Sequence, residues 1–372
     1  MDEGPLTSLN RVTVQEVARL AGVSTATVDR VLNNRGGVRA TKSRRVLEVA
    51  MTLGYIDERD QRAIDVGPRS RIVFVLPNGR SRYISALGRL IVARTAEFER
   101  LRLTPLVEYV NSFSPKALAK ALRQHAGNGQ GIAFMAIEHP LVREAVAQLG
   151  ADGIPVATLI SDISCPGRLA YFGLDNRAAG RTAGELLGRF IGDGPAKVAM
   201  IAGSLNYRAH GEREMGFLDI LQEMYPNIEV VGLREGKDDE DLNFRLMRSL
   251  LSQHPDLRGV YNIGSGAAGV ARALKHVRKS KKVAFVGHGL TADTRESLID
   301  GTMDAVITQD AGDTISQCAA FFANLRSGQG TVTPPEPMRI EIVLRENLPS
   351  SSISSGVPPR LASAPSGTPA KA

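Results

Sequence analysis

The sequence predicts an α/β protein in which a small all-α headpiece precedes a larger domain with two lobes built on parallel sheets. Two observations predict this fold class. Residues 11–56 contain short helical patterns and no strand pattern. From Arg71 to about Leu344, short apolar runs rich in β-branched residues alternate with amphipathic helical segments, which is typical of doubly wound sheets. Because the chain has 372 residues, it can form several cores, and we expect two similar lobes in this second part.

The headpiece begins with the spacing of a capping box, in which Thr13 and Glu16 satisfy each other's free amides at a helix start. Apolar residues then recur on one helical face, at Val14, Val17, Ala18 and Ala21. Gly22 supplies a turn, and Ser24 can cap a second helix over Thr25–Leu32. The residues of this part that should point inward are Val23, Val28, Val31 and Leu32.

A third helix is expected over Lys42–Leu53, with Thr41 as its cap and Gly54 at its end. Two short helices joined by a glycine turn, with a third helix to bury their apolar faces, are typical of a helix-turn-helix. The alternative is an exposed helical pair in which Arg30 is only a solvated charge.

In a helix-turn-helix, the first turns of the second helix enter the major groove of DNA. The side chains that should then face base edges are Thr25, Ala26 and Arg30, of which Arg30 can donate two hydrogen bonds to guanine. Those expected to contact phosphates are Ser24, Thr27, Arg35, Arg39, Lys42 and Arg44, and Asn33 is a further candidate DNA contact. Between Asn10 and Ala50, eight Lys/Arg stand against three Asp/Glu, so five of the chain's seven net positive charges lie here.

The run VTVQEVARLAGVSTATVDRVLNNRGGVRATKSRRVLEVAMTLGY resembles the headpiece of the lactose/galactose repressor family, and Ala21–Asn33 is its most specific part. The resemblance extends over most of the chain. It implies an operator-binding headpiece, then a hinge helix that places a leucine in the minor groove, then an effector domain similar to periplasmic sugar-binding proteins.

The linker, residues 57–70, departs from the family pattern. The usual Pro-Asn and Ala-Arg-x-Leu are missing, and Ile64 stands where the intercalating leucine would lie. Acidic residues in this segment are unfavourable near phosphates. Whether a hinge helix forms therefore stays open.

The effector domain is expected over 71–347, followed by a low-complexity tail, 348–372, that we expect to be disordered. The predicted strands are Ile72–Leu76, Pro105–Tyr109, Ile132–Ala136, Val156–Ile160, Val198–Ala202, Glu229–Leu233, Gly259–Ile263, Val283–Val286 and Ala305–Thr308. The predicted helices are Ile84–Leu101, Pro115–His125, Leu141–Leu149, Ala178–Ile191, Glu212–Tyr225, Leu242–Gln253, Ala267–His276 and Thr314–Leu325. A ligand would bind between the lobes, near the carboxyl ends of the strands.

Arg213, in the pattern R-x-x-G-F, resembles the family's effector-contacting arginine, and its guanidinium can fork onto vicinal hydroxyls or a carboxylate. Gln309 and Asp310 resemble a further polar contact position. Other candidates lie near or beyond the ends of predicted strands and could hydrogen-bond a polyol: Tyr83, Glu138, Asn262 and His288. Asp175 and Asn176 match the family's D-N-x-x-A-G helix start, where a structural cap is the favoured interpretation.

Two features weaken the prediction of a plain sugar. Gly287, His288 and Gly289 stand where the family usually has an acid that binds hydroxyls, and the chain has no tryptophan for stacking. A polyol, pentose or modified sugar is the leading expectation.

The run Gly264–Gly269 satisfies the GxGxxG pattern of dinucleotide-binding enzymes, but no acidic residue follows at the required spacing. We expect these glycines to let backbone amides approach a ligand instead. An NAD-binding or sugar-modifying enzyme with a DNA-binding appendage is the alternative, and a pure transport protein is a further one. The sequence shows no nucleophile elbow, no HExxH motif and only two distant cysteines, so we expect no enzyme activity, metal or cofactor.

The combined expectation is a ligand-responsive DNA-binding transcription regulator, a repressor in its simplest form. It would bind a pseudo-palindromic operator on double-stranded DNA as a homodimer or higher homo-oligomer, with a sugar or polyol as effector. The N-terminal residues lack the basic and apolar regions of a signal peptide, and no apolar stretch reaches membrane-spanning length, so a cytoplasmic location is expected.

Overall fold

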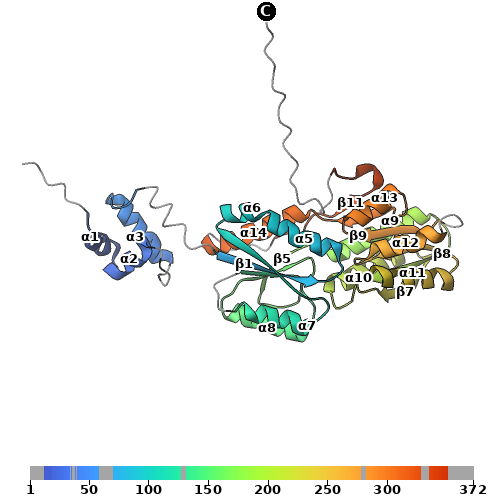
Figure 1. Ribbon diagram of the computed structural model, residues 1–372, viewed down its shortest axis with the longest axis horizontal. Helices are drawn as coiled ribbons and strands as arrows, with labels where there is room; N and C mark the ends of the chain where they lie inside the picture. Colours follow the sequence, from blue (N-terminus) through green and yellow to red (C-terminus); the bar gives the residue numbers. More distant parts are fainter. Residues whose placement is uncertain are drawn as a thin grey trace, which may run out of the picture. The chain divides into compact units, whose positions relative to one another are not determined.

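The computed structural model describes residues 12–33, 35, 38, 40–57, 70–126, 131–277, 282–327 and 335–350. The chain divides into two compact units with their main boundary between Ser70 and Arg71, and each is described by itself (Figure 1). Most of the predicted linker and tail, including Ile64, lies outside the described residues.

The headpiece contains three helices, α1 (Val14–Ala21), α2 (Thr25–Leu32) and α3 (Ala40–Thr52). The Thr13–Glu16 capping box and the Ser24 cap, which accepts from the Thr27 amide at 3.2 Å, are both confirmed. Gly22 and Gly54 have φ of 69° and 68°, a left-handed backbone that favours glycine. The expected Thr41 cap is wrong, because α3 already begins at Ala40 and Thr41 lies inside its first turn.

Valines form the centre of the headpiece core. Val17, Val28 and Val46 come from the three different helices and are completely buried. Because each helix is short and only one of its faces is apolar, the three stabilise one another mainly through this shared core. The outward faces of α1 and α2 are thereby left free of a packing role.

The second unit has two lobes, each with a sheet covered by helices. The lobe I elements are β1 (Ser70–Asn78), α5 (Arg82–Ala93), α6 (Thr95–Arg100), β2 (Leu103–Asn111), α7 (Pro115–Gln124), β3 (Gly131–Phe134), α8 (Pro140–Ala151), β4 (Val156–Leu159) and β5 (Arg168–Phe172). The sheet order is β2-β1-β3-β4-β5, with parallel pairing of β1 to β3, β3 to β4 and β4 to β5.

The lobe II elements are α9 (Asn176–Ile191), β6 (Ala196–Ala202), α10 (Arg208–Met224), β7 (Ile228–Glu235), α11 (Glu240–Gln253), β8 (Leu257–Asn262), α12 (Ala267–Val277), β9 (Ala284–His288), α13 (Ala292–Ile299), β10 (Ala305–Thr308), β11 (Glu341–Val343) and the 3-10 turn η1 (Arg345–Asn347). The sheet order is β11-β10-β9-β8-β6-β7. Among the described strands of this sheet, β11 runs antiparallel to its neighbour β10 and the other pairs are parallel.

The chain crosses between the lobes more than once. After β10, helix α14 (Ala311–Ser327) returns to lobe I, where Ile315, Cys318 and Phe322 join the core around β1 and β3. Met338 and Val343 then pack in the lobe II cores. Figure 1 shows this exchange, since the orange α14 lies beside the blue and cyan elements of lobe I. Each lobe therefore has its own core, and the chain passes between the lobes at several connecting segments.

Every predicted strand and helix has a counterpart, but the prediction was incomplete. The expected helix Ile84–Leu101 is two helices, α5 and α6, with the break at Arg94. Strands β5 and β11 and helix α13 were not predicted. No helix in the described part of the chain combines the length and apolar character needed to cross a bilayer.

Candidate functional site

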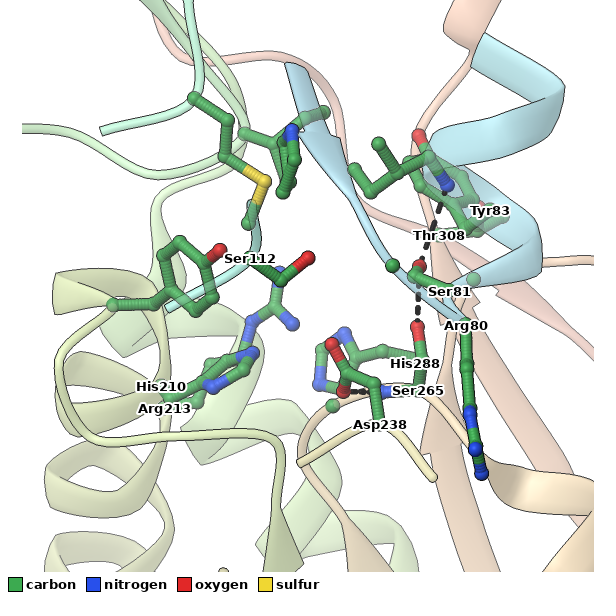
Figure 2. A pocket seen from close by; sticks show the side chains of 18 of the residues that line it. Arg80, Ser81, Tyr83, Ser112, His210, Arg213, Asp238, Ser265, His288 and Thr308 are labelled. Carbon is green, nitrogen blue, oxygen red and sulfur yellow. Dashed lines mark hydrogen bonds between the residues drawn. The ribbon is translucent and has the colours of Figure 1, made fainter. Parts of the chain in front are cut away.

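A cavity of about 740 Å³ lies between the two lobes. Its lining side chains follow the carboxyl ends of strands in both sheets, as expected for doubly wound folds. Phe113, Met135 and Ile160 come directly or nearly directly after β2, β3 and β4 of lobe I. The principal polar lining residues of lobe II are His210, Arg213, Asp238, Ser265, His288, Thr308 and Gln309. Figure 2 shows His210, Arg213, Asp238, Ser265 and His288 around the cavity below Ser81 and Ser112, with Thr308 beside Tyr83.

Arg213 lines the cavity from α10 and is held in place by lobe II. Its Nε donates to Asn176 Oδ1 at 2.8 Å and its Nη1 donates to the Ile263 carbonyl at 2.9 Å. Burial lowers its pKa from the usual value, and nearby tyrosines partly offset this effect. The remaining Nη2 has no hydrogen-bond partner among the described residues, so it is available to a ligand.

Two glycines in the sequence motifs around Arg213 allow helices α9 and α10 to pack closely. A Cβ at Gly180 of α9 would lie 2.1 Å from the Arg213 carbonyl oxygen, and one at Gly216 of α10 would lie 2.0 Å from that of Arg177. The two helices can approach this closely only with glycine at both positions. The D-N-x-x-A-G and R-x-x-G-F patterns therefore fix the position of the helix that bears Arg213. Asp175 caps α9 by accepting from the Ala178 amide, which confirms its structural role.

Asp238 places a carboxylate in the cavity. It lies after β7, and its Oδ1 accepts from the Ser265 amide at 2.8 Å. Burial raises the pKa of this carboxyl, while the Ser265 hydrogen bond and the charge of Arg213 lower it. Oδ2 has no partner among the described residues. The cavity thus has the acid that Gly287–Gly289 fails to supply, contributed by a different strand end.

His210 and His288 are neutral lining groups. Burial and the nearby Arg213 charge lower the pKa of His210 to about 3, and the pKa of His288 falls well below 6.5 for the same reasons. His210 Nδ1 lies 2.8 Å from the Ser204 carbonyl oxygen, and the Ser204 amide lies 3.2 Å from the same nitrogen, so Ser204 holds the ring in either tautomer. Tyr261, whose own pKa burial raises, donates to His288 Nε2 at 2.6 Å, which leaves His288 Nδ1 as a donor.

Backbone strain is concentrated around this cavity. Five described non-glycine residues have a left-handed backbone, and three of them line the cavity: Phe113, Ile160 and Asp238, with φ of 59°, 64° and 55°. Such conformations cost free energy, most of all for a β-branched residue like Ile160, and they gather at sites where precise placement of a side chain matters. This concentration supports the cavity as the functional site of the second unit.

The effector contacts predicted from sequence divide into two groups. Tyr83, Arg213, His288 and Gln309 line the cavity. Glu138 does not line it, because its carboxylate pairs with Arg143 and accepts from the Ser164 amide. Asn262 does not line it either, because its side chain is buried and donates to the Gly264 carbonyl at 2.9 Å.

Sequence reasoning missed several lining residues: Ser81, Ser112, Phe113, Met135, Ile160, His210, Asp238 and Ser265. His210 lies only one helical turn before Arg213, and that spacing could have identified it. Asp238 gave no signal of this kind, because it lies in a run of polar residues typical of a solvated loop.

Three consecutive residues of lobe I bridge to lobe II at the edge of the cavity. Arg80 pairs with Asp239, and the Ser81 hydroxyl lies 2.7 Å from that of Ser265. Arg82 pairs with Glu240 at 3.0 Å and with Asp293 at 2.7 Å. We call Arg80–Arg82 and their partners the bridging segment. The bridging segment links the lobes next to Asp238, because Ser265 contacts Ser81 through its hydroxyl and donates its amide hydrogen to Asp238.

The run Gly264–Gly269 serves packing as well as the cavity. Gly264 and Ser265 line the cavity, in agreement with close approach to a ligand. A Cβ at Gly269 would lie 1.9 Å from the Glu240 carbonyl oxygen, so this glycine is needed for contact between α12 and α11. In the described part of the chain, no three His, Cys, Asp or Glu side chains gather in a way that could hold a metal ion.

The DNA-facing set of the headpiece lies largely on the surface. Thr25, Ala26 and Arg30 are exposed on α2, and the Arg30 side chain has no hydrogen-bond or ion-pair partner among the described residues. The other exposed members are Ser24, Asn33, Arg35 and Lys42, whereas Thr27 is half-buried. Arg39 lies outside the described residues.

Asp29 organises the end of α2. Its carboxylate accepts from Asn33 Nδ2 at 2.7 Å and from Arg35 Nη1 at 3.2 Å. Asp29 therefore holds the Asn33 and Arg35 side chains in place in the absence of DNA, whereas the Arg30 side chain has no partner among the described residues.

Fold and sites together define a class of protein, in which a helix-turn-helix headpiece is joined to a two-lobed domain with a ligand cavity between its lobes. Residues 13–58 match the bacterial regulatory proteins of the lacI family, and residues 72–330 match the periplasmic binding protein domain. The headpiece is a helix-turn-helix domain of the lacI family, and the chain belongs to the periplasmic binding protein family through its second unit.

Individual relatives match parts of the chain. The chain is 25% identical over 287 residues to the HTH-type transcriptional regulator CelR of Thermobifida fusca, covering 75% of this chain and 82% of that one. It is 30% identical over 169 residues to the ribose import binding protein RbsB of Escherichia coli (strain K12), covering 45% of this chain and 56% of that protein. The chain thus spans just over half the length of this second relative.

Solved structures share the fold of the second unit. A solute-binding protein of an ABC transporter from Burkholderia graminis C4D1M, in complex with D-arabinose, superposes with a TM-score of 0.70 at 23% identity. The match covers 76% of this chain and 98% of that chain. At this identity the similarity establishes the fold alone.

Proposed function

We propose that this protein is a ligand-responsive transcription regulator whose headpiece reads operator DNA and whose interlobe cavity binds a small sugar-like or polyol effector. The observation that carries the proposal is the exposed face of α2. Thr25, Ala26 and Arg30 stand outward on a helix whose other face is fixed in a packed core, and the Arg30 side chain has no partner among the described residues. A rigid helix with free polar side chains is what base recognition in the major groove requires.

The regulator is proposed to act as a repressor on a pseudo-palindromic operator, as a homodimer or higher homo-oligomer. Two headpieces related by a twofold axis match two half-sites, and occupied DNA would block polymerase. Because its partner is chromosomal DNA, the protein is proposed to work in the cytoplasm. Ser24, Thr27, Asn33, Arg35, Arg39 and Lys42 are proposed to contact DNA beside the base-reading residues, and Ile64 to occupy the minor groove.

The effector is proposed to bind in the interlobe cavity, where Tyr83, Arg213, His288 and Gln309 meet Asp238 and His210. Effector binding would favour one arrangement of the lobes and so change the affinity of the headpiece for DNA. Relatives support this class of ligand, since one is named for ribose import and one was solved with D-arabinose.

The experiment that tests DNA reading compares two variants of the exposed cationic residues. Arg30→Ala should weaken operator binding by about 1–3 kcal/mol and relax sequence preference at one base pair. Lys42→Ala, an exposed residue at the start of α3, should weaken binding to every duplex and reduce the salt dependence of the affinity by about one ion. Fluorescence anisotropy on the protein's own promoter region and on random duplex measures both.

If Arg30→Ala weakens binding equally on all DNA sequences, Arg30 does not read a base. If the unmodified protein binds its promoter region no better than random duplex at physiological salt, with and without sugars and polyols, the proposal as a whole is wrong.

A further inference from the structure

The two walls of the interlobe cavity differ in chemistry, and the effector should match both. We propose that the effector is an uncharged polyol or sugar that carries an apolar group, such as a deoxy carbon or a methyl, alkyl or aryl substituent, facing lobe I. This inference rests on the proposed function and specifies the chemistry of the ligand at the same site.

The lobe II wall supplies both donors and acceptors. Arg213 Nη2 and His288 Nδ1 donate into the cavity, Asp238 Oδ2 accepts, and the His210 ring adds a further polar group. A hydroxyl group both donates and accepts, so a row of hydroxyls satisfies this wall. Each of these four groups is held by another hydrogen bond within lobe II, which fixes the direction in which it faces.

The charges of the cavity cancel. Arg213 is the inward-facing cation, and Asp238 is the inward-facing carboxylate. Both histidines are neutral, and the exposed Arg80 at the edge already pairs with Asp239. A phosphorylated sugar would bring close to two negative charges into a site with one cation that is already balanced, so we infer an uncharged effector.

Few polar groups of the lobe I wall are free, because Arg80 pairs with Asp239 and the Ser81 hydroxyl lies 2.7 Å from that of Ser265. Ile84, Phe113, Met135 and Ile160 present hydrocarbon, sulfur and ring surface to the cavity, and Met135 itself is only 7% exposed. The side-chain hydroxyls of Ser112 and Tyr83 lie beside this apolar surface. A ligand hydroxyl placed against Met135 would lose its hydrogen bonds to water and find no replacement there, whereas a methyl group would gain favourable apolar contact.

The left-handed backbone at Phe113 and Ile160 adds weight to this assignment. Both apolar side chains are placed against the cavity by conformations that cost free energy. An apolar residue that merely filled space would not require such a backbone, so contact with an apolar part of the ligand is the function that accounts for the strain.

Matched pairs of sugars test the inference by isothermal titration calorimetry on the full-length protein. The pairs are D-galactose with D-fucose, D-glucose with 6-deoxy-D-glucose, L-mannose with L-rhamnose, and D-ribose with methyl β-D-ribofuranoside, and D-ribose 5-phosphate and D-glucose 6-phosphate represent charged ligands. In each of the first three pairs, the second sugar has a methyl group where the first has a hydroxymethyl group, and in the fourth pair the second sugar carries an added O-methyl group. In a pair that binds, this second member should bind at least about tenfold more tightly. The phosphates should not bind.

Substitution of the apolar wall should remove the preference. Met135→Gln keeps a similar length and adds a donor and an acceptor, so the affinities within a binding pair should converge. Met224→Gln, at a methionine that is 63% exposed on α10, is the control and should leave the preference unchanged. If Met135→Gln does not fold, as judged by its thermal melt, Phe113→Asn replaces it, because asparagine tolerates the left-handed backbone at that position.

The outcomes separate this inference from the proposed function. Tighter binding of the fully hydroxylated members, or of a phosphate, overturns the inference and leaves a sugar-responsive regulator intact. The absence of binding by every member, in a protein that still recognises its operator, counts against both the sugar-like effector and this description of it.

Discussion

The two lobes share one layered architecture but contribute different chemistry to the cavity between them. In lobe II, Asp238, Arg213, His210 and His288 are each held by a hydrogen bond from within that lobe. Lobe I contributes mainly apolar side chains after β2, β3 and β4. The same fold has therefore produced one wall that recognises polar groups and another that covers them.

This difference implies an order of events. Because the polar groups of lobe II depend on no contact from lobe I for their placement, they are arranged for a ligand even when the lobes are apart. We expect the effector to bind lobe II first, and lobe I to close over it and exclude water, which strengthens the buried hydrogen bonds. The bridging segment, Arg80–Arg82, then holds the closed arrangement.

The largest effect is expected from Asp238→Asn in lobe II. This change keeps the size of the side chain and tolerates its left-handed backbone, but it removes the cavity's carboxylate. Loss of a buried charge-assisted hydrogen bond should weaken effector binding by about 100-fold. Calorimetry with the tightest-binding sugar measures the change.

Asp256→Asn is the matched control, since Asp256 is an exposed lobe II acid that pairs with Lys197 away from the cavity. Equal affinities of the Asp238→Asn variant and the unmodified protein would show that recognition does not depend on lobe II.

The buried histidines of lobe II should make the stability of the protein depend on pH. Their folded-state pKa values lie below the unfolded value near 6.5, so the unfolded chain takes up protons first as the pH falls. The stabilisation is complete above pH 6.5 and is lost as the pH falls toward 3, by up to about 1.4 kcal/mol per pH unit for each histidine. Asp238 acts in the opposite direction, because its raised pKa lets the folded state take up its proton first.

Urea unfolding between pH 7 and pH 5 measures this loss. His288→Gln should reduce the slope of unfolding free energy against pH, whereas the same substitution at the exposed His276 should not. Equal slopes in the His288→Gln variant and the unmodified protein would contradict burial of a neutral imidazole at this position.

A smaller effect is expected at the bridging segment. Arg82 is 55% exposed, and its partners Glu240 and Asp293 are 31% and 21% exposed, so solvent screens these pairs. Arg82→Glu should weaken effector binding by roughly fivefold at low salt, because it opposes closure, and less at high salt. Adding Glu240→Arg should restore part of the affinity.

The control is Arg89→Glu, an exposed arginine on the same helix that does not bridge the lobes. A loss of affinity that is independent of salt, or an equal loss in the Arg89→Glu variant, would mean that the bridging segment does not act by electrostatic attraction between the lobes.

The contrast between regions also explains how far the sequence alone could lead. Elements with strong apolar patterns, such as β1 and β8, were predicted because their burial determines their composition. Helix α13 buries only Thr294, Ser297 and Leu298, so it carried little periodic signal. Strand β11 has three residues at a sheet edge, two of them exposed, and it depends on pairing with β10.

The site shows the same division. Arg213 and His288 could be predicted because they occupy a helix motif and a strand end. Glu138 and Asn262 also follow or end strands, but their side chains do not line the cavity. Glu138 pairs with Arg143, and Asn262 donates to the Gly264 carbonyl. Asp238 could not be predicted, because its direction depends on a left-handed turn and on Ser265, which is distant in sequence.

The smallest effect is expected from Ser112→Ala in lobe I. The Ser112 hydroxyl has no hydrogen-bond partner among the described residues, and the ligand group nearest to it is expected to be apolar. Its removal should change effector affinity by no more than about threefold, because the neighbouring lobe I surface already binds through apolar contact. The measurement is the same calorimetric titration, with Asp238→Asn on the other wall for comparison. If Ser112→Ala weakens binding as much as Asp238→Asn does, lobe I takes an equal part in polar recognition, and the two walls do not have separate roles.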